Sequence, residues 1–412
     1  MEVPQGYKQT SIGVIPADWE VYKLKEILVS DRLGGNYENS EGNAGLPVIK
    51  MVNIGRGNIS LSKIQYLPID EKYNEADILK NGDLLFNTRN TLDLVGKVSV
   101  WKNELPKALY NSNLLKLEFD TAFVKSNFFM NYLFNSRKVL TRLRSYATGT
   151  TSVAAIYSRD LKLLKLALPP LPEQQKIAEI LSTWDTAIET CQKTIEQLKQ
   201  RNKGLAQQLL SGKTNHMDGE DPHKDFHVVG KYVREVSKRN ADLQEKRILS
   251  VTNSRGFINQ SEQFGRELAS ADLTNYKIIK KGQFAYNPSR VNVGSIDLLT
   301  KYESGILSPM YVVFEMSTGN LIPEFLYYHL KTYWFTGHIP MFVQGSVRDS
   351  LSFDGFSGMK FYIPEPRIQK EIVEKLETAA AELKLYENKL QNLQQQKKGL
   401  MQQLLTGKVR TV

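Results

Sequence analysis

The sequence has few of the residues that build covalent cross-links or metal sites. Its single cysteine, Cys191, excludes an internal disulfide framework and a cysteine-based zinc site. The five histidines, at positions 216, 223, 227, 329 and 338, show no zinc-ligand spacing. We therefore expect no metal in this chain.

Long apolar runs are also missing. No stretch reaches the length of apolar residues that a bilayer span needs. Residues 1–10 lack the basic-then-apolar pattern of a secretory signal, so a cytoplasmic location is expected. The chain has 412 residues, 41% of them hydrophobic, which is too long for one ordinary domain and rich enough for real cores.

Acidic residues are fewer than basic residues in this chain. Lysine and arginine number 54 against 44 aspartates and glutamates, which gives a formal net charge of +10. A basic excess favours a polyanionic partner, because cations that neutralise phosphates release bound counterions. Charge alone leaves open whether that partner is a nucleic acid.

Two segments of the chain match without a gap. Residues 165–213 and 360–408 align throughout and end in the similar strings KGLAQQLLSGK and KGLMQQLLTGK. A looser match lies upstream, where KNGDLLFN (80–87) parallels KKGQFAYN (280–287). The repeat indicates one unit used twice, a divergent globular domain followed by a well-matched segment.

Each matched segment carries apolar residues in alternating steps of four and three. This 3.5-residue period predicts a helix that buries one narrow stripe against a partner helix. The seam in the first copy comprises Ile177, Leu181, Trp184, Ile188, Cys191, Ile195, Leu198, Leu205 and Leu209, and in the second Ile372, Leu376, Ala379, Leu383, Tyr386, Leu390, Leu393, Leu400 and Leu404. Asn202 and Lys397 take equivalent seam positions, where a polar residue costs stability but penalises wrong registers.

The repeat predicts an α+β fold with two globular mixed α/β domains separated by a long antiparallel two-helix coiled coil, related by a pseudo-two-fold axis. Each helix of about 35–40 residues would span roughly 50–60 Å. The repeat alone leaves a parallel pair open, but an antiparallel pair lets the second domain leave the first helix and enter the second at the same place. The expected divisions are 1–164 (domain 1), 165–213 (helix 1), 214–359 (domain 2) and 360–412 (helix 2).

Three features resemble the specificity (S) subunits of type I restriction-modification systems. They are the opening GYKQTSIGVIPADWEVYKLKEIL (6–28), the string GTTSVAAIYSRDLKLLKLALPPLPEQQKIAEIL (149–181) and the duplicated helices. The resemblance covers nearly the whole chain. The second copy departs from the pattern where Arg367 and Ile368 replace the Pro-Glu of the first.

The resemblance implies a non-catalytic DNA-specificity subunit. Each of two target-recognition domains would read one half of a bipartite, asymmetric site in double-stranded DNA, and the coiled coil would set the spacer. The family resemblance also implies two methyltransferase (modification) subunits docked on the helices, with S-adenosylmethionine bound to those partners and no cofactor in this chain. Two motor-nuclease (restriction) subunits would complete the complex.

Candidate DNA-contacting residues are polar side chains in matching places of the two units, because these side chains reach the donors and acceptors of the major groove. After the matched strands they are Asn87, Thr88, Arg89 and Asn90, with counterparts Asn287, Ser289, Arg290 and Asn292; further loops offer Lys50, Arg56, Arg255, Thr150, Ser346 and Arg348. The alternative is that these residues form solvated strand-end turns.

Two other function classes stay open, a single-chain DNA methyltransferase or nuclease with built-in recognition domains, and a coiled-coil scaffold that binds only proteins. Ser211-Gly212-Lys213-Thr214 resembles the end of a phosphate-binding loop, but Gln207 stands where that loop needs a glycine. Asn287-Pro288-Ser289-Arg290 departs from the Asn-Pro-Pro-aromatic motif of amino-methyltransferases at its last two residues. The missing motifs favour recognition without catalysis.

Overall fold

The computed structural model describes residues 3–38, 44–150, 152–212, 225–260, 272–343 and 350–411. The chain forms two compact units, residues 1–192 with 389–412 (unit 1) and residues 193–388 (unit 2). No helix among the residues described combines the length and apolar character that a bilayer span requires.

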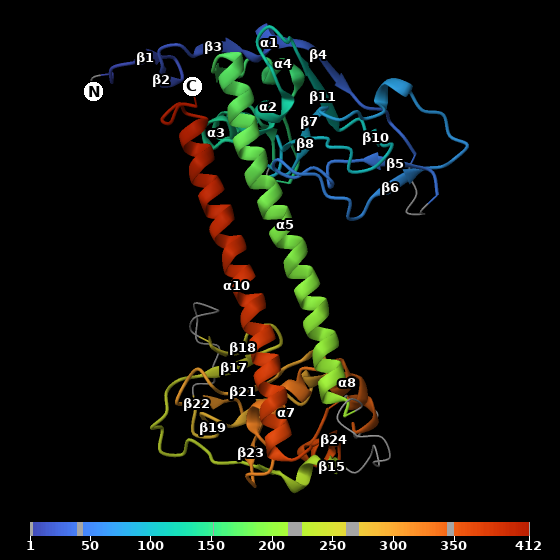
Figure 1. Cartoon of the computed structure of the whole chain (residues 1–412), viewed down its shortest axis with the longest axis vertical. Helices are drawn as coiled ribbons and strands as arrows, with labels where there is room; N and C mark the ends of the chain where they lie inside the picture. The colour runs from blue at the N-terminus through green and yellow to red at the C-terminus, as the bar shows by residue number, and fades with distance from the viewer. Residues whose placement is uncertain are drawn as a thin grey trace. The chain divides into compact units, whose positions relative to one another are not determined.

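Unit 1 is built around a four-stranded antiparallel sheet whose buried strands carry the core (Figure 1). Its order is β4 (Leu28–Leu33), β11 (Leu114–Phe119), β7 (Leu84–Asn87), β9 (Val98–Val100). Smaller sheets join β10 (Leu109–Tyr110), β5 (Leu46–Ile49) and β6 (Gln65–Leu67); β12 (Thr148–Gly149), β13 (Ala154–Ala155) and β8 (Arg89–Asn90); β14 (Lys165–Leu168) and β3 (Glu20–Lys23); and β1 (Tyr7–Thr10) and β2 (Gly13–Pro16). The short helices of this unit are α1 (Leu24–Ile27), η1 (Glu75–Asp77), α2 (Asn127–Phe134), α3 (Arg137–Ser145) and α4 (Ser158–Leu161).

Unit 2 repeats the same central sheet. Its order is β16 (Val233–Glu235), β23 (Val312–Met316), β20 (Phe284–Tyr286), β21 (Ile296–Leu298), again antiparallel throughout. Two-stranded sheets pair β15 (Phe226–Val228) with β24 (Lys360–Tyr362), β17 (Leu249–Thr252) with β18 (Gly256–Asn259), and β19 (Lys277–Lys280) with β22 (Ser304–Leu307). The helices are η2 (Val229–Lys231), η3 (Val291–Val293), α7 (Pro323–Leu330), α8 (Tyr333–His338), η4 (Ile339–Met341) and α9 (Phe353–Ser357).

Two long helices, α5 (Leu171–Leu210) and α10 (Pro366–Leu404), contribute to both units. In unit 1 the beginning of α5 packs on the end of α10, since Ile177 and Leu181 share a core with Leu404. In unit 2 the end of α5 packs on the beginning of α10, since Leu210 shares a core with Ile372 and Leu376. The pairing is therefore antiparallel within each unit (Figure 1), and the predicted fold class is confirmed.

The seam residues predicted from the period lie at different depths. Ile177, Leu181, Cys191, Ile195, Leu198, Ile372, Leu376, Ala379 and Leu404 are buried, whereas Trp184, Ile188, Leu205, Leu209, Leu383, Tyr386, Leu390, Leu393 and Leu400 are half-buried. A two-helix seam covers each side chain on one side only, so half-burial of part of the seam is expected.

The two polar seam residues are both satisfied. In unit 2, Asn202 Nδ2 donates to the Ala379 carbonyl of α10 at 2.8 Å. In unit 1, Lys397 Nζ pairs with the carboxylate of Asp185, which also accepts a hydrogen bond from the Tyr132 hydroxyl at 2.6 Å. Each polar position thus ties α5 to α10 at one register, which agrees with a register-fixing role.

The chain after α10 turns back onto the N-terminal strands. Gly407 has φ of +69°, and a Cβ there would lie 2.2 Å from Pro16 Cγ, so only glycine fits the turn. The Tyr7 hydroxyl donates to the Gly407 carbonyl at 2.9 Å. Gly212, at the matching position after α5, has φ of +75°. Both glycines therefore end their helices in the left-handed conformation.

Candidate nucleic-acid interface

The first polar cluster divides into a structural and an exposed part. Asn87 is the last residue of β7 and is fully buried, and its Oδ1 accepts a hydrogen bond from the Arg89 backbone N–H at 3.1 Å. The expectation that Asn87 belongs to an exposed reading cluster is therefore wrong, because its side chain holds the turn that follows the strand. Arg89 is exposed, Asn90 is half-buried, and the Thr88 hydroxyl donates to the Asn113 carbonyl at 2.9 Å.

The second cluster repeats this local geometry. Asn287 Oδ1 accepts from the Ser289 backbone N–H at 3.1 Å, and the side chains of Ser289, Arg290 and Asn292 are exposed. In both units an asparagine at the end of the central strand shapes the turn, and an arginine two or three residues later projects into solvent. Arg89 and Arg290 are thus exposed cations close behind matching turns, Arg89 at the second residue after its asparagine and Arg290 at the third.

Two of the other candidates, Thr150 and Arg255, lie in segments that contact these turns or their neighbours. In unit 1, β8 (Arg89–Asn90) pairs with β13, which pairs with β12, so exposed Thr150 belongs to the same small sheet as Arg89. In unit 2, exposed Arg255 lies in the turn of the β17–β18 hairpin. This turn lies close to the segment that contains Asn292, since a Cβ added to Gly294 would be 3.5 Å from the Cβ of Asn253. Ser346 and Arg348 lie outside the described residues.

Lys50 and Arg56 differ from exposed Arg89 because both are partly buried and hydrogen-bonded. The Lys50 ammonium bonds the Gln65 amide oxygen, and burial lowers the pKa of Lys50. Arg56 is half-buried, and one nitrogen of its guanidinium donates to the Asp93 carbonyl at 2.9 Å. Burial first, and the neighbouring Arg144 second, lower the pKa of Arg56. Cations that repel each other while partly desolvated are poised for an anionic partner.

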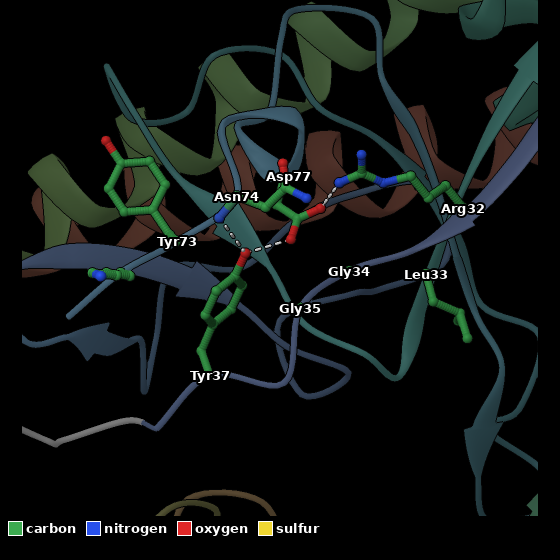
Figure 2. A pocket seen from close by; sticks show the side chains of 9 residues that line it. Arg32, Leu33, Gly34, Gly35, Tyr37, Tyr73, Asn74 and Asp77 are labelled. Carbon is green, nitrogen blue, oxygen red and sulfur yellow. Dashed lines mark hydrogen bonds and ion pairs between the residues drawn. The ribbon is translucent and has the colours of Figure 1, made fainter.

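A pocket of about 480 Å³ opens in the globular part of unit 1 (Figure 2). Figure 2 shows the Tyr37 hydroxyl directed at the carboxylate of Asp77, which also pairs with the Arg32 guanidinium. Asp77 thus balances the charge of Arg32, and exposed Lys72 is the other charged residue of the lining.

Sequence reasoning missed helix α3. Its nine residues include four cations, Arg137, Lys138, Arg142 and Arg144, while Val139 and Leu143 are buried. The signal was present in the string RKVLTRLRS, but a single short cationic run resembles any solvated helix face. Only the structure places it beside Arg56 and the end of α10, around one cavity.

The repeated central sheet, with an exposed arginine close behind the matching turn of each unit, defines a protein of two similar domains. Residues 16–200 match the model of the type I restriction modification DNA specificity domain. Over that segment the chain is similar to the specificity subunits of type I restriction-modification systems.

One relative matches over nearly the full length of the chain and another over about half of it. The chain is 26% identical, over 98% of its length and 97% of the relative, to a putative type I restriction enzyme MjaX specificity subunit of Methanocaldococcus jannaschii. It is 31% identical to the MjaVIII specificity subunit of the same organism, over 51% of this chain and 49% of that one. The solved type I restriction-modification S subunit of M. genitalium shares the fold, with a TM-score of 0.57, 15% identity and 98% coverage of both chains.

Proposed function

We propose that this chain is the non-catalytic subunit that gives a type I restriction-modification complex its sequence specificity. Each recognition domain reads one half of a bipartite, asymmetric site in double-stranded DNA. The antiparallel helices α5 and α10 set the number of unread base pairs between the halves and dock the methyltransferase subunits.

The placement of Arg89 and Arg290 close behind matching turns carries this proposal. Both arginines are exposed on turns that an asparagine holds at the end of the same strand of a repeated sheet. Arginine makes the commonest specific contact to guanine in the major groove, and the sequences around the two arginines differ. Two equivalent turns with different neighbours suit two half-sites of different sequence.

The proposed complex contains two methyltransferase subunits, which bind S-adenosylmethionine and methylate adenine, and two motor-nuclease subunits. The complex acts in the cytoplasm. Register-fixing contacts at Asn202 and Lys397 support a stiff spacer, because each contact penalises sliding of one helix along the other.

Methylation mapping tests the proposal directly. Cells that express this chain with its methyltransferase partner should carry methylated adenines in one motif made of two different halves and a fixed gap. A continuous motif, or a motif of two identical inverted halves, would contradict the two-domain reading.

Two further measurements separate the alternative classes. The purified chain incubated with DNA and labelled S-adenosylmethionine should transfer no methyl group; transfer would favour a single-chain methyltransferase. A scaffold that binds only proteins predicts no salt-dependent affinity for a DNA duplex, whereas the proposed subunit has one.

A further inference from the structure

Unit 1 contains a large open cavity between its recognition domain and its part of the helix pair. The cavity has a volume of about 1390 Å³. Its walls come from the loops at Arg56–Ile59 and at residues 102–104, helix α3, the segment Asp185–Gln192 of α5, and residues 394–408 at and just beyond the end of α10. All of these segments belong to unit 1.

Positive charge dominates the lining. Eight lysines and arginines face three carboxylates around the cavity. One of these carboxylates, Asp185, is already neutralised by Lys397. The cavity therefore presents a field that attracts an anion, and its concave shape strengthens that field.

Three of the four cations of α3 form no ion pair among the described residues, whereas Arg142 donates to the Lys165 and Ile12 carbonyls at 2.9 and 3.2 Å. Among the described residues, Arg137, Lys138 and Arg144 form no ion pair, and Arg56 Nη1 is buried without a hydrogen-bond partner. Burial lowers the pKa of Lys138, and the nearby Arg142 and Lys408 lower it further. The free protein thus holds cations together at an electrostatic cost that a bound polyanion would relieve.

The fold itself does not require these cations, as unit 2 demonstrates. Helix α8 is the counterpart of α3, since each follows the helix that covers the central sheet and each begins after a hydroxyl residue, Ser136 or Thr332. Buried Val139 and Leu143 of α3 correspond to buried Phe335 and Ile339.

The outward positions of the two helices differ completely. Arg137 and Lys138 correspond to Tyr333 and Trp334, and Arg144 corresponds to Pro340 of η4, just beyond the end of α8. Half-buried Arg142, which donates to two backbone carbonyls, corresponds to His338. The apolar face needed for packing is kept in both units, whereas the cationic face is found on α3 and not on α8. A function other than folding is needed to explain that difference.

We propose that the cavity of unit 1 binds the phosphodiester backbone of duplex DNA and anchors recognition domain 1 through α3, a contact that helix α8 of unit 2 does not make. This inference rests on the proposed function, because it assumes that the chain binds DNA. Guanidinium groups bind phosphate through two parallel hydrogen bonds, and ammonium groups neutralise it as point charges. Such contacts fix position and carry no sequence information.

The test compares two triple variants of the full chain that lose the same charge. The first is Arg137→Gln, Lys138→Gln and Arg144→Gln in the cavity. The control is Lys203→Gln, Lys370→Gln and Lys375→Gln, which are exposed lysines of α5 and α10 outside it. Fluorescence anisotropy with a labelled random-sequence duplex gives the binding constant across a salt series.

The cavity variant should bind with a salt dependence that is shallower by about 3 in the slope of log binding constant against log salt, one unit for each lost phosphate contact. The control should keep the wild-type slope. A charge-preserving variant, Arg137→Lys with Arg144→Lys, should also keep most of the wild-type slope. This variant separates the effect of lost charge from the effect of lost folding. The affinity ratio between the mapped target and the random duplex should stay unchanged in all variants.

Three results would overturn the inference. The first is an equal salt slope for the cavity and control variants. The second is a salt slope in the charge-preserving variant as shallow as in the cavity variant. The third is wild-type DNA binding by the cavity variant combined with loss of assembly with the methyltransferase subunit, which would make the cavity a protein-docking site. If the wild-type chain itself shows no salt-dependent DNA affinity, the proposed function fails as well.

Discussion

Gln174 on α5 and Gln369 on α10 make the same three hydrogen bonds, 195 residues apart along the chain. The Nε2 of each donates to a proline carbonyl five residues earlier, at 2.9 Å to Pro169 and 2.7 Å to Pro364. The same nitrogen donates to a domain carbonyl, at 2.8 Å in both units, and Oε1 accepts from a domain backbone N–H. Both side chains are buried, so each amide fastens the start of a long helix to its own domain.

Replacing either glutamine with leucine should loosen only the unit that contains it. Gln174→Leu leaves buried backbone groups of unit 1 without partners, which costs about 1–3 kcal/mol, and Gln369→Leu does the same in unit 2. Hydrogen exchange measured on peptides of each unit reports the loss. Gln175→Leu, at the exposed neighbouring position, is the matched control and should change neither unit. Equal loss in both units from one substitution would contradict separate fastening.

Arg410 should be needed to keep Glu173 buried. Its guanidinium donates to both carboxylate oxygens of Glu173 at 2.8 Å, and Glu173 is fully buried. Arg410→Met leaves that charge without its main partner and should destabilise unit 1 by about 3 kcal/mol in urea unfolding. Ile368 stands at the position equivalent to Glu173 in the second copy. The double variant Glu173→Ile with Arg410→Met should therefore lose less stability than Arg410→Met alone; a larger loss would refute this reading of the pair.

Unit 2 should lose stability in acid through His329. The imidazole is buried against Phe325 and Phe361, and burial lowers its pKa to about 3. Below about pH 6.5 the unfolded chain binds a proton that the folded unit does not, so stability falls as the pH drops from 6.5 towards 3. The slope is at most about 1.4 kcal/mol per pH unit. His329→Leu should flatten the acid dependence of hydrogen exchange in unit 2. Unit 1 contains no histidine and serves as the internal reference.

The turn arginines should control sequence choice without controlling stability. Arg290→Ala should relax the methylation motif in one half-site, at a cost of about 1–3 kcal/mol in discrimination, and Arg89→Ala should relax the other half. Methylation mapping of cells that carry each variant reads out the motif. The matched contrast is Asn87→Ala, which removes the buried amide that holds the Arg89 turn and should lower the stability of unit 1. A motif unchanged by both arginine substitutions would remove these residues from base reading.

The helix pair should act as a ruler. Removing seven residues from α5 and the seven facing residues from α10 shortens each helix by about 10 Å and should shorten the unread spacer by about three base pairs. Shortening one helix alone should misalign the seam and destabilise the pairing, because the contacts of Asn202 and Lys397 no longer match. Methylation mapping measures the spacer directly. A spacer that keeps its length after matched trimming would show that the helices do not set it.

The sequence by itself determined the repeat, the two long helices and their polar seam positions. A stripe of apolar side chains every 3.5 residues packs against a partner helix, and this stripe recurs at a constant offset. It also located the turns after β7 and β20. It could not tell which side chains on those turns face solvent. Asn87 and Arg89 are both polar and stand two residues apart, yet one is fully buried and the other exposed.

Only the tertiary structure decided which cations act together. Arg56, the cations of α3 and the end of α10 are separated by up to about three hundred and fifty residues of chain, and no local pattern links them. Their common field arises because the antiparallel helices return the C-terminal end of α10 to recognition domain 1. Periodicity fixes what a segment buries against its nearest partner, whereas electrostatic clusters depend on where the folded chain brings distant surfaces together.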